Sequence, residues 1–353
     1  MGIKQFSNPA SGYVNKFLGQ EVFDSTGSGV AVFTPGPLPD VAKASGGTIS
    51  YTPHTVIHKF TSSGSFVIPG PVGTLSCNCL IVGGGGGGGC DNGGGGAGGE
   101  VVIGSSVPVN GTNNIVIGGG GNGSTNSPAA GSKGTATTSL SLFARGGGGG
   151  SCANVSSGSP SGGPAAEPSS FGSGGGAGVT NLAEGTAGTA QSPTPSITYP
   201  TGYVGGTGSG SSNYNAGGGA GAGGNGYGGK SPTPTPNFGV GGNGVESNMI
   251  ASAPSPYWWG GGGGGGQFSP PANNVMKGGK GGGGGGKAGQ SPYSFGEGDN
   301  NGINTAADGQ PGPNPGGGAG GVNTGGGGGG DGRTMSNGGA GGSGIVVIVY
   351  DKG

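Results

Sequence analysis

Charged side chains are scarce in this sequence, where Asp, Glu, Lys and Arg together make up 7% of 353 residues. The formal net charge is −1, and the 12 Lys and Arg residues are scattered along the chain. Nucleic acids and anionic membrane surfaces attract clustered positive charge, which this sequence does not present. We therefore expect no nucleic-acid partner and no electrostatic attachment to a membrane.

Long hydrophobic runs are also missing. The longest apolar run, residues 345–350, is far shorter than the roughly 20 residues that a membrane-spanning helix needs. The N-terminal segment MGIKQFSNPASGYVNKF lacks an apolar stretch followed by a cleavage site. The sequence thus predicts a soluble protein without membrane insertion and without export by a signal peptide.

Cysteine and histidine are too few for a disulfide framework or a complete metal site. They are Cys77, Cys79, Cys90, Cys152, His54 and His58. The Cys-Asn-Cys spacing at 77–79 differs from that of the usual zinc-binding pair, and the two histidines do not complete a set of four ligands. We expect small buried thiols and no bound metal.

The apparent catalytic motifs lack the context that they need. Residues 224–231, GNGYGGKS, match the phosphate-binding pattern G-x-x-x-x-G-K-[ST], but no strand precedes them and PTPTP follows where a helix is required. Carboxylates are sparse, and those of FGEGDN at 295–300 are predicted to lie in a solvated turn. No nucleophile motif accompanies the histidines. We therefore expect neither an enzyme nor a cofactor.

Glycine is what the sequence has in abundance, with 105 residues. Ten runs contain three or more glycines: 83–89, 93–96, 118–121, 146–150, 174–176, 217–219, 260–266, 281–286, 316–318 and 325–330. The runs do not follow a Gly-X-Y period, which excludes a collagen helix, and glycine-rich composition is typical of flexible linkers. Disorder does not explain why strand-like segments adjoin the runs. It also does not explain the apolar strand-like segment near the end of the sequence, which would aggregate if it were exposed.

Alternating apolar and polar residues predict a small β-region beside the glycine runs. Residues 54–82 should contain two or three strands, separated by SSGS and PGPVG. Further strands are predicted at 100–103, 114–117, 140–144 and 345–350. The last of them should close a sheet that begins near His58.

An extended threefold helix offers an explanation for the glycine runs. The polyglycine helix of this type has three residues per turn and no internal hydrogen bonds, so its backbone groups need outside partners. Without Cβ atoms, such helices can pack side by side and bond laterally, and a seven-residue run is about 22 Å long. The predicted fold is therefore mostly irregular and β, with almost no α-helix: a small sheet that caps a bundle of laterally packed polyglycine type II helices joined by long variable loops.

Two segments at the edges of the glycine-rich region resemble a known family. HKFTSSGSFVIPGPVGTLSCNCLIVGGGGGGG at 58–89 and GGAGGSGIVVIVY at 338–350 are similar to the glycine-rich domain of bacteriophage tail-fibre and adhesin proteins. The resemblance covers residues 54–350 and implies stacked polyglycine helices whose connecting loops contact a receptor on the host cell.

Residues 1–50 differ in composition and stand outside this resemblance. They combine a predicted amphipathic stretch at 13–23 with the rigid sequence PGPLP at 35–39. We expect 1–50 to be an attachment arm that binds other virion proteins, and 51–353 to form the glycine-rich domain with its variable loops. The arrangement is compatible with a homo-oligomer.

Aromatic residues in the connectors between glycine runs are the candidate receptor-binding residues. Tyr and Trp offer rigid contact area, and neighbouring Ser, Gly and Asn offer adaptable hydrogen bonds. The candidates are Tyr199, Tyr203, Tyr214, Tyr257, Trp258, Trp259 and Phe268. The alternative role for the tryptophans is to cover the end of the bundle, and for the tyrosines it is packing within their own connector.

The order of the runs predicts which connectors share an end of the bundle. Strict up-and-down alternation of the ten runs puts connector 177–216 at one end and connector 220–259 at the other. We expect the end of 177–216 to face the receptor, which leaves Trp258 and Trp259 at the base.

These expectations describe a virion protein that is assembled in the host cytoplasm. Its predicted function is that of a tail-fibre or tail-tip adhesin that binds a surface protein or glycan of the host cell. The alternative is a non-adhesive structural protein, a capsid decoration or a head fibre.

Overall fold

The computed structural model divides the chain into two units, Met1–Lys43 and Ala44–Gly353. The residues that it describes are 42–125, 129–152, 173–178, 197–198, 202–209, 215–229, 238–250, 256–268, 276–288, 296–309, 316–332 and 336–352. The amphipathic stretch predicted at 13–23 lies outside them. All the described strands belong to the unit that starts at Ala44.

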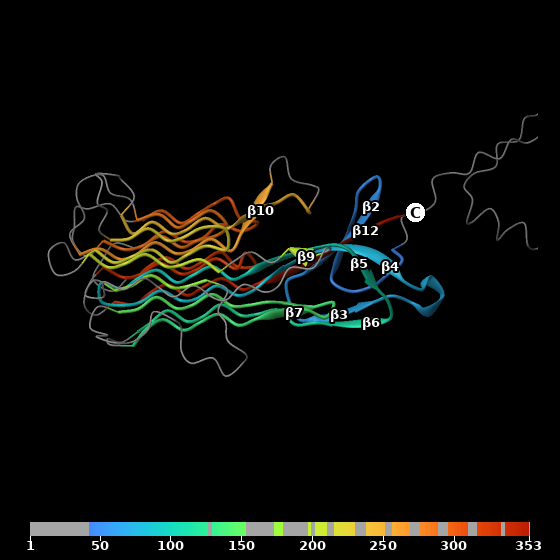
Figure 1. Ribbon diagram of the computed structural model, residues 1–353, viewed down its shortest axis with the longest axis horizontal. Coiled ribbons are helices and arrows are strands. Elements are labelled where there is room, and N and C mark those ends of the chain that lie inside the picture. Colours follow the sequence, from blue (N-terminus) through green and yellow to red (C-terminus); the bar gives the residue numbers. More distant parts are fainter. Residues whose placement is uncertain are drawn as a thin grey trace, which may run out of the picture. The chain divides into compact units, whose positions relative to one another are not determined.

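A six-stranded sheet forms one end of this unit (Figure 1). In spatial order its strands are β1 (Thr48–Tyr51), β2 (Thr55–Phe60), β12 (Ile345–Asp351), β4 (Leu75–Val82), β5 (Val101–Val109) and β9 (Ile197–Thr198), each antiparallel to its neighbours. Strand β12 lies between β2 and β4, with Ile348 opposite His58, so the prediction that it closes a sheet begun near His58 is confirmed. Residues 48–50, which the sequence assigned to the arm, belong to the sheet because β1 pairs with β2.

Residues 345–350 of strand β12 are apolar because alternate side chains of the strand enter two separate cores. On one face, Ile345 and Val347 pack in a cluster with Leu80 and Trp259. On the other face, the ring of Tyr350 stacks on that of His58, with the ring centroids 5.5 Å apart, and the His58 ring meets Phe66 edge-on at 5.0 Å.

Three two-stranded sheets complete the described β structure. They pair β3 (Gly64–Val67) with β6 (Thr112–Ile115), β7 (Thr137–Ser139) with β8 (Leu142–Ala144), and β10 (Val245–Ser247) with β11 (Tyr257–Trp259). The one helical segment among the described residues is the 3-10 turn η1 (Gly70–Val72), and no described helix has the length and apolarity to cross a bilayer. The prediction of a mostly irregular and β fold with almost no α-helix is confirmed.

Strand positions follow the sequence prediction closely but not completely. Residues 54–82 contain β2, β3 and β4 as expected, and the strand predicted at 100–103 extends to Val109 in β5. The strand predicted at 140–144 is interrupted, because Leu140 and Ser141 have φ values of 52° and 62° and form the turn between β7 and β8.

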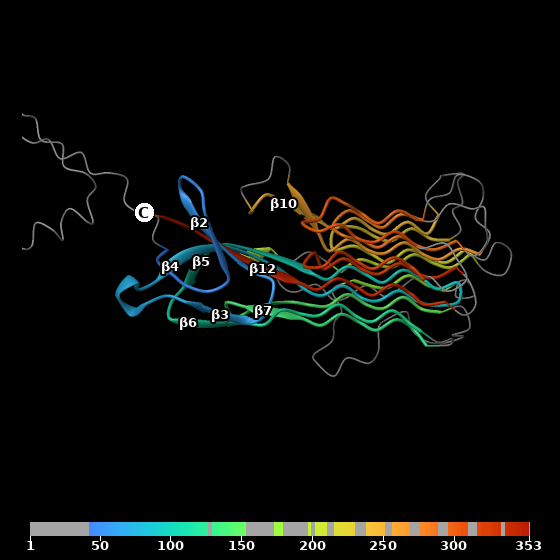
Figure 2. The same cartoon turned by 180° about the vertical axis from the view of Figure 1, so that it is seen from behind.

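Extended glycine-rich segments, here called tracts, run side by side away from the sheet and back to it (Figures 1 and 2). The outgoing tracts are 83–89, 118–124, 146–152, 173–178, 202–209, 225–229, 260–267, 281–288, 305–309 and 325–332. The returning tracts are 93–99, 129–136, 215–222, 238–244, 276–280, 296–300, 316–321 and 336–344. Their directions follow from the order of the residues that they bond.

The hydrogen bonds between tracts repeat every three residues. In tract 83–89, the N–H groups of Gly84 and Gly87 donate to the returning tract 129–136, at Thr135 (3.0 Å) and Ser132 (2.9 Å). The N–H groups of the two following residues in each turn donate to tract 336–344 and to tract 93–99, respectively. The carbonyl groups of tract 83–89 accept hydrogen bonds from the outgoing tracts 118–124, 146–152 and 325–332. Tract 83–89 thus bonds to six neighbours with a threefold period, as expected of the polyglycine type II helix.

Glycine is required in these tracts because neighbouring backbones touch. A Cβ atom at Gly85 would lie 2.1 Å from the carbonyl oxygen of Gly326, and one at Gly263 would lie 2.1 Å from that of Gly328. Contacts this short do not occur with real side chains, so the bundle excludes Cβ atoms at such positions.

Strict alternation of ten runs is wrong, for two reasons. First, tracts such as 129–136 contain no run of three glycines, because an outer tract needs glycine only on the side that faces its neighbours. Gly131 and Gly134 are buried in that tract, and the residues between them are exposed. Second, tracts 146–152, 173–178 and 202–209 all run away from the sheet.

Candidate functional site

The two ends of the tract bundle differ in how the tracts are joined. At the end beside the sheet, the proximal end, returning tracts lead into outgoing ones through described turns such as 280–282 and 321–325. At the opposite, distal end, several connectors fall outside the described residues. The residues that flank them are Thr125 and Ala129, Ser209 and Asn215, Gly229 and Phe238, Phe268 and Met276, Ala288 and Gly296, Gly309 and Gly316, and Gly332 and Ser336.

The predicted aromatic group 257–259 lies at the proximal end, in β11. Trp259 is 0% exposed and belongs to the core cluster that includes Leu80 and Val347, so its ring has no surface to offer a receptor. Trp258 is half-buried, and its ring lies 4.9 Å from the ammonium nitrogen of Lys280. Tyr257 is also half-buried and meets Trp259 edge-on, with the ring centroids 6.1 Å apart.

The other predicted aromatic residues do not join this group. Tyr203 is half-buried near the start of outgoing tract 202–209, where its carbonyl oxygen accepts the N–H of Gly174 at 2.9 Å. Phe268 is half-buried at the distal end, directly after tract 260–267. Tyr199 and Tyr214 lie outside the described residues.

A buried polar cluster that the sequence analysis missed lies at the distal ends of three tracts. Lys287 and Asp331, with side chains 2% and 0% exposed, form an ion pair with 3.4 Å between Nζ and Oδ1. Ser336 lies between them: its Oγ accepts from Lys287 Nζ at 2.8 Å and donates to Asp331 Oδ1 at 2.8 Å. Because a buried charge without its partner is costly, the three side chains fix the tract ends relative to one another.

Gln267 extends this buried polar layer to the neighbouring tracts. Its side chain is 0% exposed, and its Nε2 donates to the carbonyl oxygen of Phe238 at 3.2 Å. Its backbone bridges Asn215 on one side and Ala288 on the other. The layer therefore ties tract ends together directly below the distal connectors.

Cys90 and Cys152 form a second buried cluster at the distal end. All four cysteines are buried and free, which confirms the prediction of buried thiols. The sulfur atoms of Cys90 and Cys152 lie 2.8 Å apart, and Ser124 Oγ is 3.2 Å from Cys90 Sγ. The hydrogen bond from Cys152 lowers the pKa of Cys90 to about 7, whereas the hydrogen bond to Cys90 and burial raise the pKa of Cys152.

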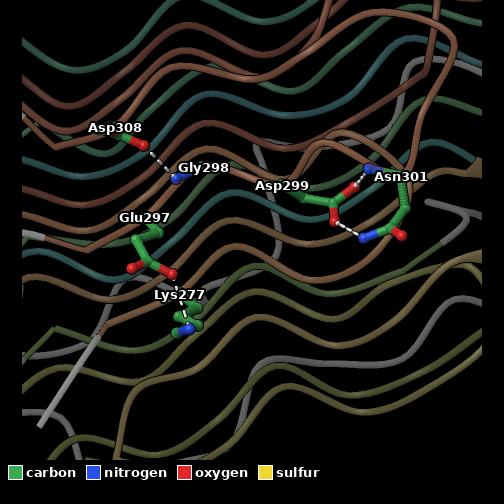
Figure 3. Close-up of polar contacts among 6 residues, drawn as sticks. All are labelled: Lys277, Glu297, Gly298, Asp299, Asn301 and Asp308. Carbon is green, nitrogen blue, oxygen red and sulfur yellow. Dashed lines mark hydrogen bonds and ion pairs between the residues drawn. The ribbon is translucent and has the colours of Figure 1, made fainter.

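Asp299 organises the proximal turn at 280–282, and Figure 3 shows its pairing with Asn301. One carboxylate oxygen accepts the N–H groups of Gly281, Gly282 and Asn301 at 2.8–3.0 Å, and the other accepts from Asn301 Nδ2 at 2.6 Å. Asp299 is only 8% exposed, so the prediction of a solvated turn at 295–300 is wrong for this residue. Its acceptor positions serve the backbone of a turn whose glycines have positive φ.

Two further carboxylates in Figure 3 hold tracts at the surface. Glu297 pairs with Lys277 at 2.6 Å, and both side chains are more than half exposed. Asp308 accepts the N–H of Gly298 at 2.8 Å. Exposed pairs of this kind contribute little to stability, typically about 0–1 kcal/mol.

The described residues include a surface depression but no cluster of metal-ligating side chains. Within them, no group of three or more His, Cys, Asp or Glu side chains is arranged to hold a metal ion. A depression of about 520 Å³ near the distal end is lined by polar residues, among them Asn122, Thr125, Ser132 and Asn337, and equally by glycines and alanines.

A family model described as a glycine-rich domain matches residues 61–257, more than half of the sequence. The chain belongs to the glycine-rich domain family. No curated protein matches it in sequence. The glycine-rich domain match ends in β11, but tracts 260–267, 281–288 and 325–332 continue the same lateral bonding. The architecture of the glycine-rich domain therefore extends towards the C-terminal strand.

One sequence signal could have located the distal clusters of this glycine-rich domain. A polar or thiol side chain follows directly after each long glycine run that reaches the distal end. These residues are Cys90, Ser151, Gln267, Lys287 and Asp331, and all are buried. The end of a glycine run thus indicates where the bundle ends and its polar layer begins.

Proposed function

We propose that the chain is a structural protein of a bacteriophage virion that acts as a tail-fibre or tail-tip adhesin. Its distal connectors contact a surface protein or glycan of the host cell, and its N-terminal arm binds other virion proteins. The virion assignment rests on the resemblance of segments 58–89 and 338–350 to phage glycine-rich domains. Catalysis has no part in this proposal.

The observation that carries the proposal is the distance along the tracts between the start of the unit and the distal connectors. The unit begins beside the sheet, where Ser45 pairs with Val67. The distal connectors begin and end at the other end of the tracts. Attachment through the residues that precede Ala44 leaves the distal connectors available for a host cell.

The tract bundle also suits the display of variable loops. Its lateral bonds use backbone atoms, so a connector can change in sequence without altering the contacts between tracts. The buried layer around Gln267 and Lys287 holds the tract ends from which the connectors start. A rigid base lowers the entropy cost of binding through loops.

Binding of the labelled full-length chain to a panel of bacterial strains tests the proposal. On a strain that binds, the double variant Tyr214→Ala with Phe268→Ala should weaken binding by about 30-fold, the effect of losing a binding hot spot. The matched control is Tyr257→Ala with Trp258→Ala at the proximal end, which should leave binding unchanged. Trp259 is kept in every variant because it is part of the core.

The outcomes separate three interpretations. Loss of binding only in the proximal variant would place the receptor contact at the sheet end and overturn the proposed orientation. If both variants bind as tightly as the wild type, recognition through these aromatic residues is rejected. If no strain to which the parent virion adsorbs binds the chain, the alternative of a capsid decoration or head fibre replaces the adhesin.

A further inference from the structure

We propose that Cys90 and Cys152 are a cross-linking pair, which forms a reversible disulfide that fastens the distal ends of tracts 83–89 and 146–152. Their sulfur atoms are 2.8 Å apart, in direct hydrogen-bonding contact. A disulfide bond of about 2.05 Å therefore requires only a small movement of the two side chains. Neither the family assignment nor the proposed adhesin function implies this bond.

The backbone already places the two cysteines in register. Tracts 83–89 and 146–152 are neighbours, since the N–H of Gly150 donates to the carbonyl oxygen of Gly87 at 2.9 Å. The N–H of Cys90 itself donates to Cys152 Sγ at 3.0 Å. A cross-link at this place adds a covalent bond to an existing contact and does not draw distant segments together.

The surroundings favour reaction between these two sulfur atoms over other thiol chemistry. Ser124 Oγ lies 3.2 Å from Cys90 Sγ, and Cys152 Sγ lies 2.6 Å from the carbonyl oxygen of Ala129. Cys90 and Cys152 are 2% and 0% exposed, so each sulfur has the other as its nearest reaction partner, and only a small oxidant can reach them. The lowered pKa of Cys90 supplies a thiolate near neutral pH.

The other two cysteines differ in both geometry and chemistry. Cys77 and Cys79 lie two positions apart on strand β4, so their Cβ atoms are separated by about two strand residues, or roughly 6.6 Å. That separation exceeds the roughly 3.5–4.5 Å which a disulfide needs. Burial raises their pKa values to about 12 and about 11. They serve as internal controls.

Formation of the disulfide removes two electrons from the two thiols, and a peroxide such as hydrogen peroxide is an oxidant that can accept them. The thiolate of Cys90 attacks one peroxide oxygen, the O–O bond breaks, and the other oxygen leaves as water after taking up a proton. The sulfur of Cys152 then attacks the sulfur of the resulting sulfenic acid, the S–O bond breaks, and a second water leaves with the thiol proton. Two thiols and one peroxide thus give one disulfide and two waters.

The experiment treats the reduced full-length protein with dilute hydrogen peroxide, quenches it with acid, and alkylates it in denaturant before peptide mass mapping. We expect the mass of the chain to fall by that of two hydrogen atoms and a linked peptide pair to contain Cys90 and Cys152. Cys77 and Cys79 should remain open to alkylation, and dithiothreitol should restore all four thiols. The oxidised protein should also have a higher Tm than the reduced one.

Two variants make the result decisive. Cys152→Ser should lose both the linked peptide pair and the rise in Tm, whereas Cys77→Ala should retain both. Independent alkylation of Cys90 and Cys152 after oxidation, or separate oxidation of each to a sulfinic acid, would overturn the cross-link. A linked protein whose Tm equals that of the reduced form would overturn the fastening role.

Discussion

At the scale of single residues, the bundle is specified by where a Cβ atom can and cannot be placed. At Gly120, a Cβ would lie 1.9 Å from the carbonyl oxygen of Gly341. At the preceding residue, Gly119, the nearest atom to a Cβ would be Thr135 Oγ1, at 3.9 Å. Neighbouring glycines in one tract therefore have opposite tolerance for a side chain, although nothing in the local sequence distinguishes them.

The pair Gly120→Ala and Gly119→Ala tests this account. Gly120→Ala should lower the free energy of unfolding by about 1–3 kcal/mol, because the methyl group forces two backbones apart. Gly119→Ala should be neutral or slightly stabilising, because alanine restricts the unfolded chain without a clash. Chemical denaturation of both variants measures the difference, and equal stability of the two would contradict lateral backbone contact in tract 118–124.

At the scale of elements, strands could be predicted better than tracts. The alternation in 54–82 indicates strands that are buried on one face, and the apolar run at 345–350 indicates a strand that is buried on both faces. Strands β2, β4 and β12 lie at the positions that these patterns predict. In the tracts, buried positions recur every three residues. In tract 336–344, for example, Gly339 and Gly342 are buried, and Asn337 and Ala340 are exposed. Counting only runs of three glycines therefore misses outer tracts such as 129–136 and 336–344.

The site was harder to predict than the fold for a related reason. Tryptophan is a residue type common in binding sites, and the local sequence does not show that Trp259 is buried. In the structure, β11 pairs with β10 and the ring of Trp259 lies in the core. The distal clusters depend on contacts between residues far apart in sequence, such as Lys287 with Ser336 and Cys90 with Cys152. No local pattern gives the order in which tracts pack, so these partners appear only in the folded chain.

Strands β2 and β12 are also joined by a side-chain network around His58. His58 is 0% exposed; its Nδ1 lies 2.7 Å from the carbonyl oxygen of Gly46, and its Nε2 lies 3.1 Å from the hydroxyl of Tyr350. The hydroxyl of Tyr350 also accepts the N–H of Ala44 at 3.1 Å. Such a network fits a neutral ring that donates from Nδ1 and accepts at Nε2.

Stability should therefore depend on pH through His58. Burial lowers the pKa of His58 below its ordinary value of 6.5, so the unfolded chain takes up a proton at a higher pH than the folded chain. The free energy of unfolding should be highest above about pH 6.5 and fall as the pH decreases from there towards the folded pKa. Denaturation between pH 8 and about pH 5.5 should show this fall in the wild type, and His58→Gln should reduce it.

The control for this prediction is His54→Gln, a change at an exposed histidine that precedes β2. It should keep the pH dependence of the wild type. Equal slopes for the wild type and His58→Gln would show that other groups cause the fall and that the network around His58 does not depend on a neutral ring.

At the scale of the whole unit, the sheet and the tract bundle are parts of one structure. Strand β4 continues into tract 83–89, and tract 336–344 continues into β12, so the chain itself joins the central strands to the tracts. Bonded tract residues are far apart in sequence, as Gly85 and Gly342 show. The bundle therefore needs the whole unit to be assembled, and we expect the sheet and the tracts to unfold together.

The variant Leu80→Ala tests this coupling, because Leu80 is 0% exposed and belongs to the sheet core. Loss of its side chain should cost about 2–5 kcal/mol. If the unit unfolds as a whole, the slowest amides of tracts 83–89 and 93–99 should exchange with solvent faster by the factor that corresponds to the same free energy, although the substitution lies outside both tracts.

Hydrogen exchange with mass spectrometry measures this factor, and denaturation followed by Trp fluorescence measures the stability of the core. Unchanged exchange in the tracts of a destabilised variant would show that the bundle is held independently of the sheet, and exchange within seconds in the wild type would contradict the lateral bonding itself.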